Sequence, residues 1–131
     1  MAVLTSKTTE GITVSAESFY QNDYSRPTEH KYIFAYRITI ENNSDYTVQL
    51  LTRHWQVFDS NGVMREVEGE GVVGLLPILA PHEVHQYISW AHLFTDMGKM
   101  LGYYTFVRQI DDEMFKVIIP EFKLVAPYKL N

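Results

Sequence analysis

Hydrophobic and polar positions alternate along much of the chain, and the longest regular stretch covers residues 32–41. A period of two is typical of a β-strand with one buried face. After a polar cluster at residues 42–45, residues 47–58 are rich in β-branched and aromatic side chains, which also favour a strand. We therefore expect two long antiparallel strands with a turn between them. In the first, the apolar positions are Tyr32, Phe34, Tyr36, Ile38 and Ile40.

Turn-forming residues divide the rest of the chain into shorter strands. Asn61-Gly62 favours positive φ at both central positions of a hairpin turn, so the next segment should fold back beside the strand before it. Asp111-Asp112 forms a later turn, and Pro120 should end the strand that follows. The further predicted strands cover residues 12–16, 63–67, 84–90, 100–110 and 114–119.

Helical spacing is almost absent, and this decides the fold class. The nearest candidate is residues 93–101, where Gly98 and the short length favour a single turn over a helix. About seven short strands separated by turns predict an all-β protein folded as an antiparallel β-sandwich. The 131 residues fit one domain, and an aromatic content of 14% suits the space between two sheets.

Composition and charge exclude several classes of function. Without cysteine, the chain has no disulfides, thiolate metal sites or cysteine nucleophiles. A net charge of -5 and scattered basic residues argue against nucleic acid or an anionic membrane as a partner. No apolar run reaches the roughly 20 residues of a membrane helix, and the first residues lack the apolar core of a secretory signal. We therefore expect a cytoplasmic protein.

Residues 69–74 (GEGVVG) have the spacing of a dinucleotide-binding loop. That mechanism needs a helix directly after the loop, whereas residues 75–81 contain Pro77 and Pro81 and cannot continue a helix. We interpret the segment as a glycine-rich sheet corner. The alternative is an anion-binding nest of backbone amides next to a positive charge. Its candidate residues are Gly69, Gly71 and Gly74, with Arg65 or Arg53 supplying the charge.

Five histidines raise the question of a metal site. His82 and His85 are three positions apart, and on a strand they would face opposite sides of the sheet. We therefore expect no resident metal ion. The alternative is a divalent-metal sensor that uses these two histidines and a carboxylate. His54 differs in context, because we expect the adjacent Trp55 to fill the core of the sandwich.

The sequence contains no recognisable catalytic arrangement. No serine lies in a G-x-S-x-G turn, as a serine hydrolase would require. The acidic residues 111–113 fall in a predicted turn, where adjacent carboxylates point in different directions and stay solvated. We expect a non-enzymatic protein without a cofactor.

Three ordered segments resemble the ApaG family of small bacterial proteins. They are residues 46–55 (YTVQLLTRHW), residues 69–74 followed by Pro77, and residues 97–104 (MGKMLGYY). The similarity runs from about Thr13 to Leu124 and includes the ending IIPEF. The resemblance implies a single domain with an immunoglobulin-like, fibronectin type III-like β-sandwich.

What the resemblance implies about function is less specific. The family is associated with cobalt and magnesium efflux, with a neighbouring gene for a diadenosine tetraphosphate hydrolase, and with F-box fusions in eukaryotes, none of which is a mechanism. Where the family carries Thr-Ser-Gly, this chain has Ile88-Ser89-Trp90, which places a tryptophan at a position expected to be exposed.

These observations favour an interaction module whose sheet face or strand edges bind a partner protein. The expected patch joins Arg53 and His54 to the glycine loop, with Trp90 as an anchor, because tryptophan and arginine dominate interface hot spots. The alternative is an anion or nucleotide binder, for example of diadenosine polyphosphates, at residues 69–74. Homodimerisation stays open, because the sequence does not reveal which strands form the sheet edges.

Overall fold

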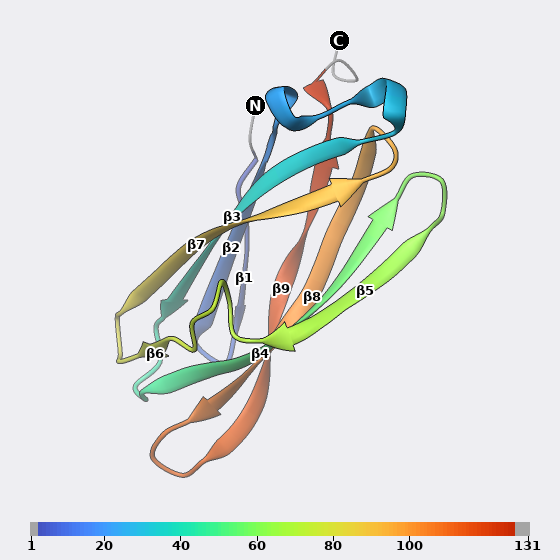
Figure 1. Cartoon of the computed structure of the whole chain (residues 1–131). Coiled ribbons are helices and arrows are strands. Elements are labelled where there is room, and N and C mark those ends of the chain that lie inside the picture. Colours follow the sequence, from blue (N-terminus) through green and yellow to red (C-terminus); the bar gives the residue numbers. More distant parts are fainter. Residues whose placement is uncertain (1–2, 128–131) are drawn as a thin grey trace.

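The computed structural model describes residues 3–127, which form two antiparallel β-sheets packed face to face (Figure 1). The first sheet has the strand order β1-β2-β3-β7, and the second has the order β5-β4-β8-β9, with the short β6 also paired to β4. This arrangement confirms the predicted all-β sandwich. No helix within the described residues is long and apolar enough to cross a membrane. The strands are β1 (Thr5–Thr9), β2 (Ile12–Tyr20), β3 (Tyr32–Asn42), β4 (Val48–Asp59), β5 (Met64–Glu70), β6 (Ile78–Leu79), β7 (Val84–Leu93), β8 (Met97–Arg108) and β9 (Glu113–Val125), and two 3-10 turns, η1 (Asn22–Tyr24) and η2 (Pro27–Glu29), lie between β2 and β3.

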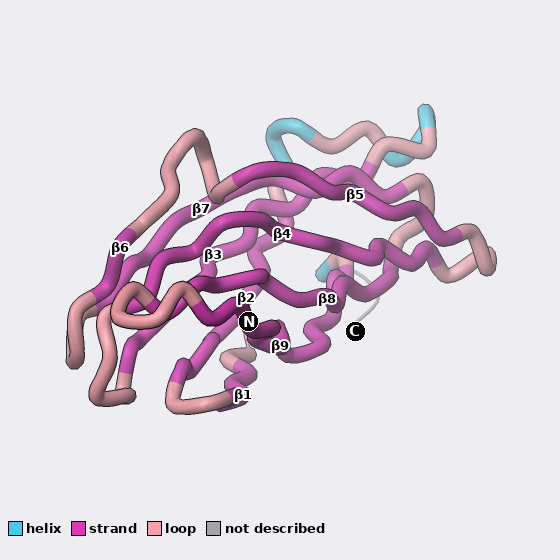
Figure 2. The backbone as a smooth tube through the Cα atoms, turned by 90° about the horizontal axis from the view of Figure 1, so that it is seen from below, coloured by secondary structure: helices cyan, strands magenta, loops and turns pink. Residues whose placement is uncertain are grey.

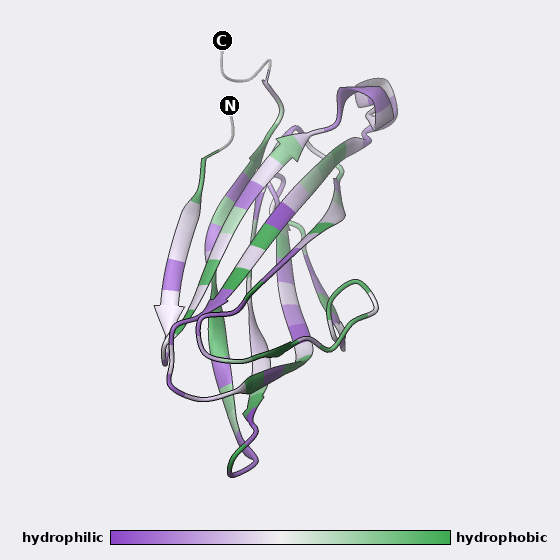
Figure 3. Ribbon diagram, turned by 90° about the vertical axis from the view of Figure 1, so that its left-hand side faces the viewer, coloured by the Kyte–Doolittle hydropathy of each residue, from purple (hydrophilic) through white to green (hydrophobic). Residues whose placement is uncertain are grey.

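The core lies between the two sheets and is rich in aromatic rings. All five apolar positions predicted for β3 are buried, and hydrophobic and hydrophilic residues alternate along the strands (Figure 3). Trp55 is 2% exposed, which confirms that it fills the core. Its ring lies 5.4 Å from that of Tyr36 and 5.9 Å from that of Phe122, both in edge-on contact. Such contacts add to the stabilisation that comes from burying the rings.

The two long strands β3 and β4 do not pair with each other, contrary to the prediction. β3 pairs with β2 and β7 in the first sheet, whereas β4 pairs with β5, β6 and β8 in the second. The turn between them crosses from one sheet to the other around the buried Asn42. Its side-chain amide donates to the carbonyls of Tyr46 (2.7 Å) and Leu79 (2.9 Å), and its side-chain oxygen accepts from the amide of Ser44.

The predicted hairpin after β4 is present, with a different turn from the one expected. β5 folds back so that Phe58 pairs with Met64. The amide of Asp59 donates to the carbonyl of Val63 at 2.9 Å, which closes a three-residue loop. In this turn only Gly62 has positive φ, at 87°. The loop is therefore one residue longer than the two-residue turn that Asn-Gly favours.

Several strands differ from the predicted ones in their boundaries, and β1 was not predicted. β8 begins at Met97, so the segment 93–101 contains only a short turn between β7 and β8. Pro120 does not end β9, which continues to Val125 through a bulge. A proline is tolerated there because β9 is an edge strand and the bulge removes the need for its N–H. β1 is an addition to the predicted strands, because its sequence TSKTT contains no alternation of apolar residues.

One side of the sandwich is closed and the other is open. On the closed side, β1 and β2 lie against β9, where the amide of Ile118 donates to Thr9 and the hydroxyl of Ser18 donates to the carbonyl of Lys123. On the other side the sheets end in β7 and β5. Figure 2 shows the loop between β5 and β6 standing out beside β6 and β7 at this open side.

Candidate functional site

β7 forms the outer edge of the first sheet, and half of its backbone groups face away from β3. The amide of Asn42 donates to the carbonyl of Glu83 at 3.0 Å, so this pair is hydrogen-bonded. Hydrogen-bonded and non-bonded pairs alternate in an antiparallel ladder. The N–H and C=O groups of the even-numbered residues therefore point outward, and the carbonyl of His92 accordingly accepts a hydrogen bond from Arg65 of β5. We call the outward backbone groups of Val84, Gln86, Ile88 and Trp90 the open edge of β7.

Five strands of residues 3–127 lie at sheet edges, because the two-residue β6 also pairs with β4. Among them, β7 alone has no charged residue, short length, proline or bulge. β1 is five residues long and carries Lys7. β5 carries Arg65 and three glutamates, and β9 has four charged residues and the bulge at Pro120. Proteins commonly protect edge strands with charges, short length, proline or bulges. β7 has ten residues, no lysine, arginine, aspartate or glutamate, and an uninterrupted register with β3.

Apolar side chains accompany the open edge on the outer face of the first sheet. Val84, Ile88 and Trp90 are each more than half exposed. The ring of Trp90 contacts that of Tyr24 from η1 in an edge-on arrangement, at 5.2 Å. This exposure of Trp90 agrees with the sequence-based expectation. Large apolar side chains in one stripe are typical of surfaces that bind another molecule.

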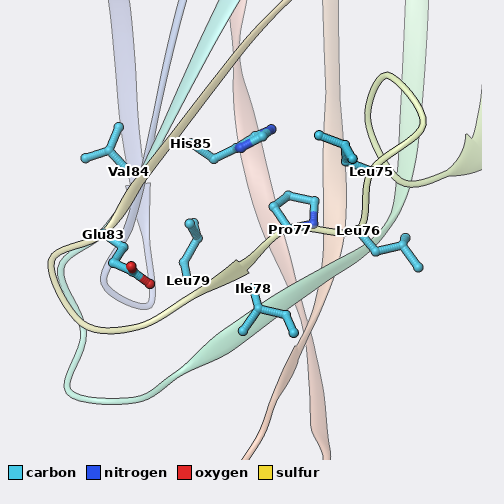
Figure 4. Close-up of a pocket in the computed structure, with 8 residues that line it drawn as sticks. All are labelled: Leu75, Leu76, Pro77, Ile78, Leu79, Glu83, Val84 and His85. Atoms are coloured by element: carbon cyan, nitrogen blue, oxygen red, sulfur yellow. The ribbon is translucent and has the colours of Figure 1, made fainter.

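A pocket of about 340 Å³ lies beside the first residues of β7 (Figure 4). This volume is at the lower end of the range for ligand pockets. The ring of His85 points from β7 toward Leu75 and Pro77, whereas Val84 points away. The lining is mostly apolar and comes from two segments of the chain, which contribute Leu75, Leu76, Pro77, Ile78 and Leu79 on one side and Glu83, Val84 and His85 on the other.

His85 is the polar group of this pocket. Its Nε2 atom is buried and makes no hydrogen bond with any residue of 3–127. Burial lowers the pKa of His85 below its ordinary value of 6.5, because desolvation penalises the charged imidazolium. A neutral imidazole can donate one hydrogen bond and accept another, but because Nε2 is covered, a molecule in the pocket reaches it only if the ring turns.

The glycine loop is held by Arg53. A side chain at Gly69 would begin 2.7 Å from the guanidinium of Arg53, so this glycine leaves room for the arginine to lie against β5. The guanidinium donates to the carbonyls of Glu70 and Gly71, each at 2.9 Å. The chain then bends rather than entering a helix, as the two prolines predicted, and Val73 has positive φ. Arg53 thus fixes the corner from which the apolar segment 75–79 begins.

The donors proposed for anion binding are partly used within the chain. The amide of Gly71 donates to the carbonyl of Leu51 at 2.8 Å. Gly74 lies in open space with positive φ. Arg65 lies at the far end of β5, where it pairs with Asp59 and lies over the ring of Phe94. The structure therefore brings Arg53 to the glycine loop and does not bring Arg65 there.

The predicted interaction patch is divided among three surfaces. Arg53 points toward the space between the sheets, and the next residue, His54, points to the outer face of the second sheet, because successive side chains of a strand alternate. Trp90 lies on the outer face of the first sheet. His82 has positive φ in the turn before β7, whereas His85 is in the pocket. Residues 75–78 were missed as site residues, because an apolar run in sequence does not reveal whether it is buried.

Behind the open edge, hydroxyl groups connect β7 to the second sheet. The Tyr87 and Tyr104 hydroxyls lie 2.5 Å apart, and both rings are buried. Burial raises the pKa of both tyrosines, and the proximity of the two groups raises that of Tyr104 further. The positive charge of Arg53 acts in the opposite direction on both. The strand with the open edge is therefore fixed from its inner face.

Comparisons with known proteins agree with this architecture. The family model of the ApaG domain matches residues 22–108. Protein ApaG of Brucella abortus (strain S19) is 45% identical over 122 residues, which are 93% of each chain. Protein ApaG of Brucella anthropi is 48% identical over 119 residues, which are 91% of each chain. The structure of the putative ApaA protein from Bordetella pertussis is 39% identical and has a TM-score of 0.86, covering 88% of this chain and 94% of that one.

Proposed function

This chain belongs to the ApaG family, and we propose that it is a cytoplasmic, non-enzymatic interaction module that binds an extended segment of a partner protein along the open edge of β7. The observation that carries the proposal is the contrast between β7 and the other strands that end the two sheets. β1, β5 and β9 have charges, short length or a bulge, and β7 has none of these. An unprotected edge strand is the surface to which an incoming strand adds.

Backbone groups supply the affinity in this mode of binding. An extended segment that lies antiparallel or parallel to β7 meets the outward N–H and C=O groups of Gln86 and Ile88. These hydrogen bonds do not depend on the side chains of the partner. The partner segment must therefore be free of proline at the positions that pair with β7.

Side-chain pockets supply the specificity. Alternate residues of an added strand point to opposite faces of the sheet. On the inner face, one apolar side chain can enter the pocket lined by Leu75 and Leu76, next to the unused nitrogen of His85. On the outer face, its neighbours lie beside Ile88 and Trp90, which are exposed. We therefore infer a partner segment with apolar residues on both faces and few charges.

Anion binding and a role in cobalt or magnesium homeostasis have less support from the geometry than partner binding at β7. Anion binding by residues 69–74 would compete with the hydrogen bonds that the Gly71 amide and Arg53 already make. A connection with cobalt or magnesium homeostasis would, under this proposal, act through the partner protein, with the chain as a regulatory component.

Photo-crosslinking in living cells tests the proposal, because it captures a partner whose identity is still unknown. A benzoylphenylalanine at Ile88 should crosslink to a defined protein, whereas one at the exposed Met114 of β9 should not. The informative variant is Gln86→Pro, which removes an outward N–H and keeps the ladder with β3. We expect it to abolish the crosslink from position 88.

The matched control is Gln86→Ala, which removes the same side chain and its hydrogen bond to Thr39 and retains the N–H. It should keep the crosslink. Denaturant unfolding of both variants checks that each is folded. A crosslink that persists in folded Gln86→Pro, or that is equally strong from position 114, would contradict the proposal.

A further inference from the structure

The imidazole of His54 lies between two carboxylates on the outer face of the second sheet. Its Nδ1 atom is 2.6 Å from a carboxylate oxygen of Glu68, and its Nε2 atom is 3.8 Å from one of Glu66. Selected donor atoms of the three residues all lie within 4.8 Å of one another. β4 and β5 create this arrangement, because His54 pairs directly with Glu68, and Glu66 is two residues away on the same face.

The histidine is held in a fixed orientation. Its ring stacks on that of Tyr103 of β8, with centroids 4.9 Å apart and planes at 14°. The ammonium of Lys116 lies over the same tyrosine ring, 4.5 Å from its centroid. Only 17% of the His54 side chain is exposed. A ligand group that is already ordered loses little conformational entropy when it binds an ion.

The two carboxylates lie next to different nitrogens of the imidazole, Glu68 next to Nδ1 and Glu66 next to Nε2. A carboxylate accepts from the Nδ1–H of a neutral imidazole, and the other nitrogen, Nε2, then carries a free lone pair. Metal-binding histidines commonly have this arrangement, in which an outer carboxylate orients the ring. In this chain Glu68 takes the outer position, and the lone pair of Nε2 is on the side of Glu66.

The distance between the two remaining donors fits a metal ion. Zinc binds imidazole nitrogen and carboxylate oxygen at about 2.1 Å each, so two such ligands lie at most about 4.2 Å apart. The separation of 3.8 Å between His54 Nε2 and Glu66 satisfies this limit. A nitrogen and oxygen donor set favours zinc and similar first-row ions, whereas magnesium and calcium favour oxygen alone.

We propose that His54 and Glu66 bind a divalent first-row transition ion of the zinc class, with Glu68 as the carboxylate that positions the imidazole. The remaining coordination positions are filled by water, so the ion exchanges readily. This site lies on the second sheet, away from the open edge of β7, and it does not depend on the proposed function. It also differs from the pair His82 and His85 that the sequence suggested.

NMR titration of the full chain with zinc chloride tests the site. Zinc should shift the Nε2 resonance of His54 and the amides of the paired strands, and magnesium chloride should not. Glu66→Gln should remove this response. Glu68→Gln should weaken zinc binding about tenfold, the lower limit usual for loss of an outer-sphere carboxylate.

The matched control is His82→Gln, which alters a histidine outside the site and should bind zinc as the unmodified chain does. All variants should keep the amide spectrum of the folded protein, since the changed side chains are at the surface. The proposal is overturned if millimolar zinc leaves the His54 resonances unmoved. It is also overturned if Glu66→Gln retains the affinity of the unmodified chain.

Discussion

At the scale of single residues, close backbone approach leaves no room for a side chain at Gly102 of β8. A side chain added there would overlap the carbonyl oxygen of His54 on the neighbouring strand. Backbone atoms within a sheet cannot move aside as a flexible side chain can. The same residue pairs with Trp55, whose ring occupies the adjacent core.

We therefore predict that Gly102→Ala lowers the free energy of unfolding by about 2 kcal/mol or more, because it forces a backbone shift in a packed sheet. The control is Gly74→Ala, where the added methyl group enters open space and only the positive φ opposes it. That variant should lose about 1 kcal/mol. Denaturant unfolding compares the two, and equal losses would contradict the assigned role of Gly102.

Residue-level contacts of this kind are poorly predictable from sequence. Gly69 stands out in the sequence as part of a loop motif, but its contact is with Arg53, which lies sixteen positions earlier on the paired strand. Trp55 is correctly predicted as a core residue because it alternates along its strand with Val57, which is buried on the same face. Whether Arg53 would point to the glycine loop depends on the β4 bulge near Leu51, which no local pattern indicates.

At the scale of elements, the hydroxyl pair of Tyr87 and Tyr104 joins β7 to the opposite sheet. Both hydroxyls are buried, and removing one leaves the other without its partner. An unpaired buried hydroxyl costs about 1–3 kcal/mol. We expect Tyr87→Phe and Tyr104→Phe each to be destabilised, and the double variant to lose less than the sum of the two. Additive losses in this double-mutant cycle would show that the pair does not interact.

The same pair predicts sensitivity to alkaline pH. Burial raises the pKa of both tyrosines above the ordinary value of 10.0, so the folded state favours the neutral form. Their contribution to stability is complete below pH 10.0 and is lost as the pH rises above it, because only the unfolded chain ionises freely. The free energy of unfolding of the unmodified chain should therefore fall between neutral pH and a pH above 10.0. That of the double variant Tyr87→Phe, Tyr104→Phe should fall less over the same range, and denaturant unfolding at the two pH values measures both.

Strand periodicity predicts which faces are buried better than it predicts which strands are neighbours. The alternation in residues 32–41 correctly places five side chains in the core. It does not show that β3 and β4 lie in different sheets, because both strands would bury the same faces in either arrangement. Pro120 predicts a strand end, and only the bulge of the edge strand explains why β9 continues past it.

At the scale of the whole molecule, the sandwich has one closed side and one open side. β1 and β2 cover β9, and β7 is left as the unprotected edge, with an apolar pocket beside its first residues. The sequence does not reveal that β7 lies at a sheet edge, because strand order depends on pairing between distant segments and no single segment predicts it. The proposed metal site lies on the other sheet, so one chain can bind a partner and an ion independently under these proposals.

Amide hydrogen exchange within β7, followed by NMR on the free protein over a range of dilutions, tests the open edge most directly. The amides of Gln86 and Ile88 should exchange rapidly at every concentration, whereas those of Tyr87 and Ser89, which bond to β3, should be strongly protected. Equal protection of both sets would contradict the account, because it would mean that the outward groups of β7 are already covered.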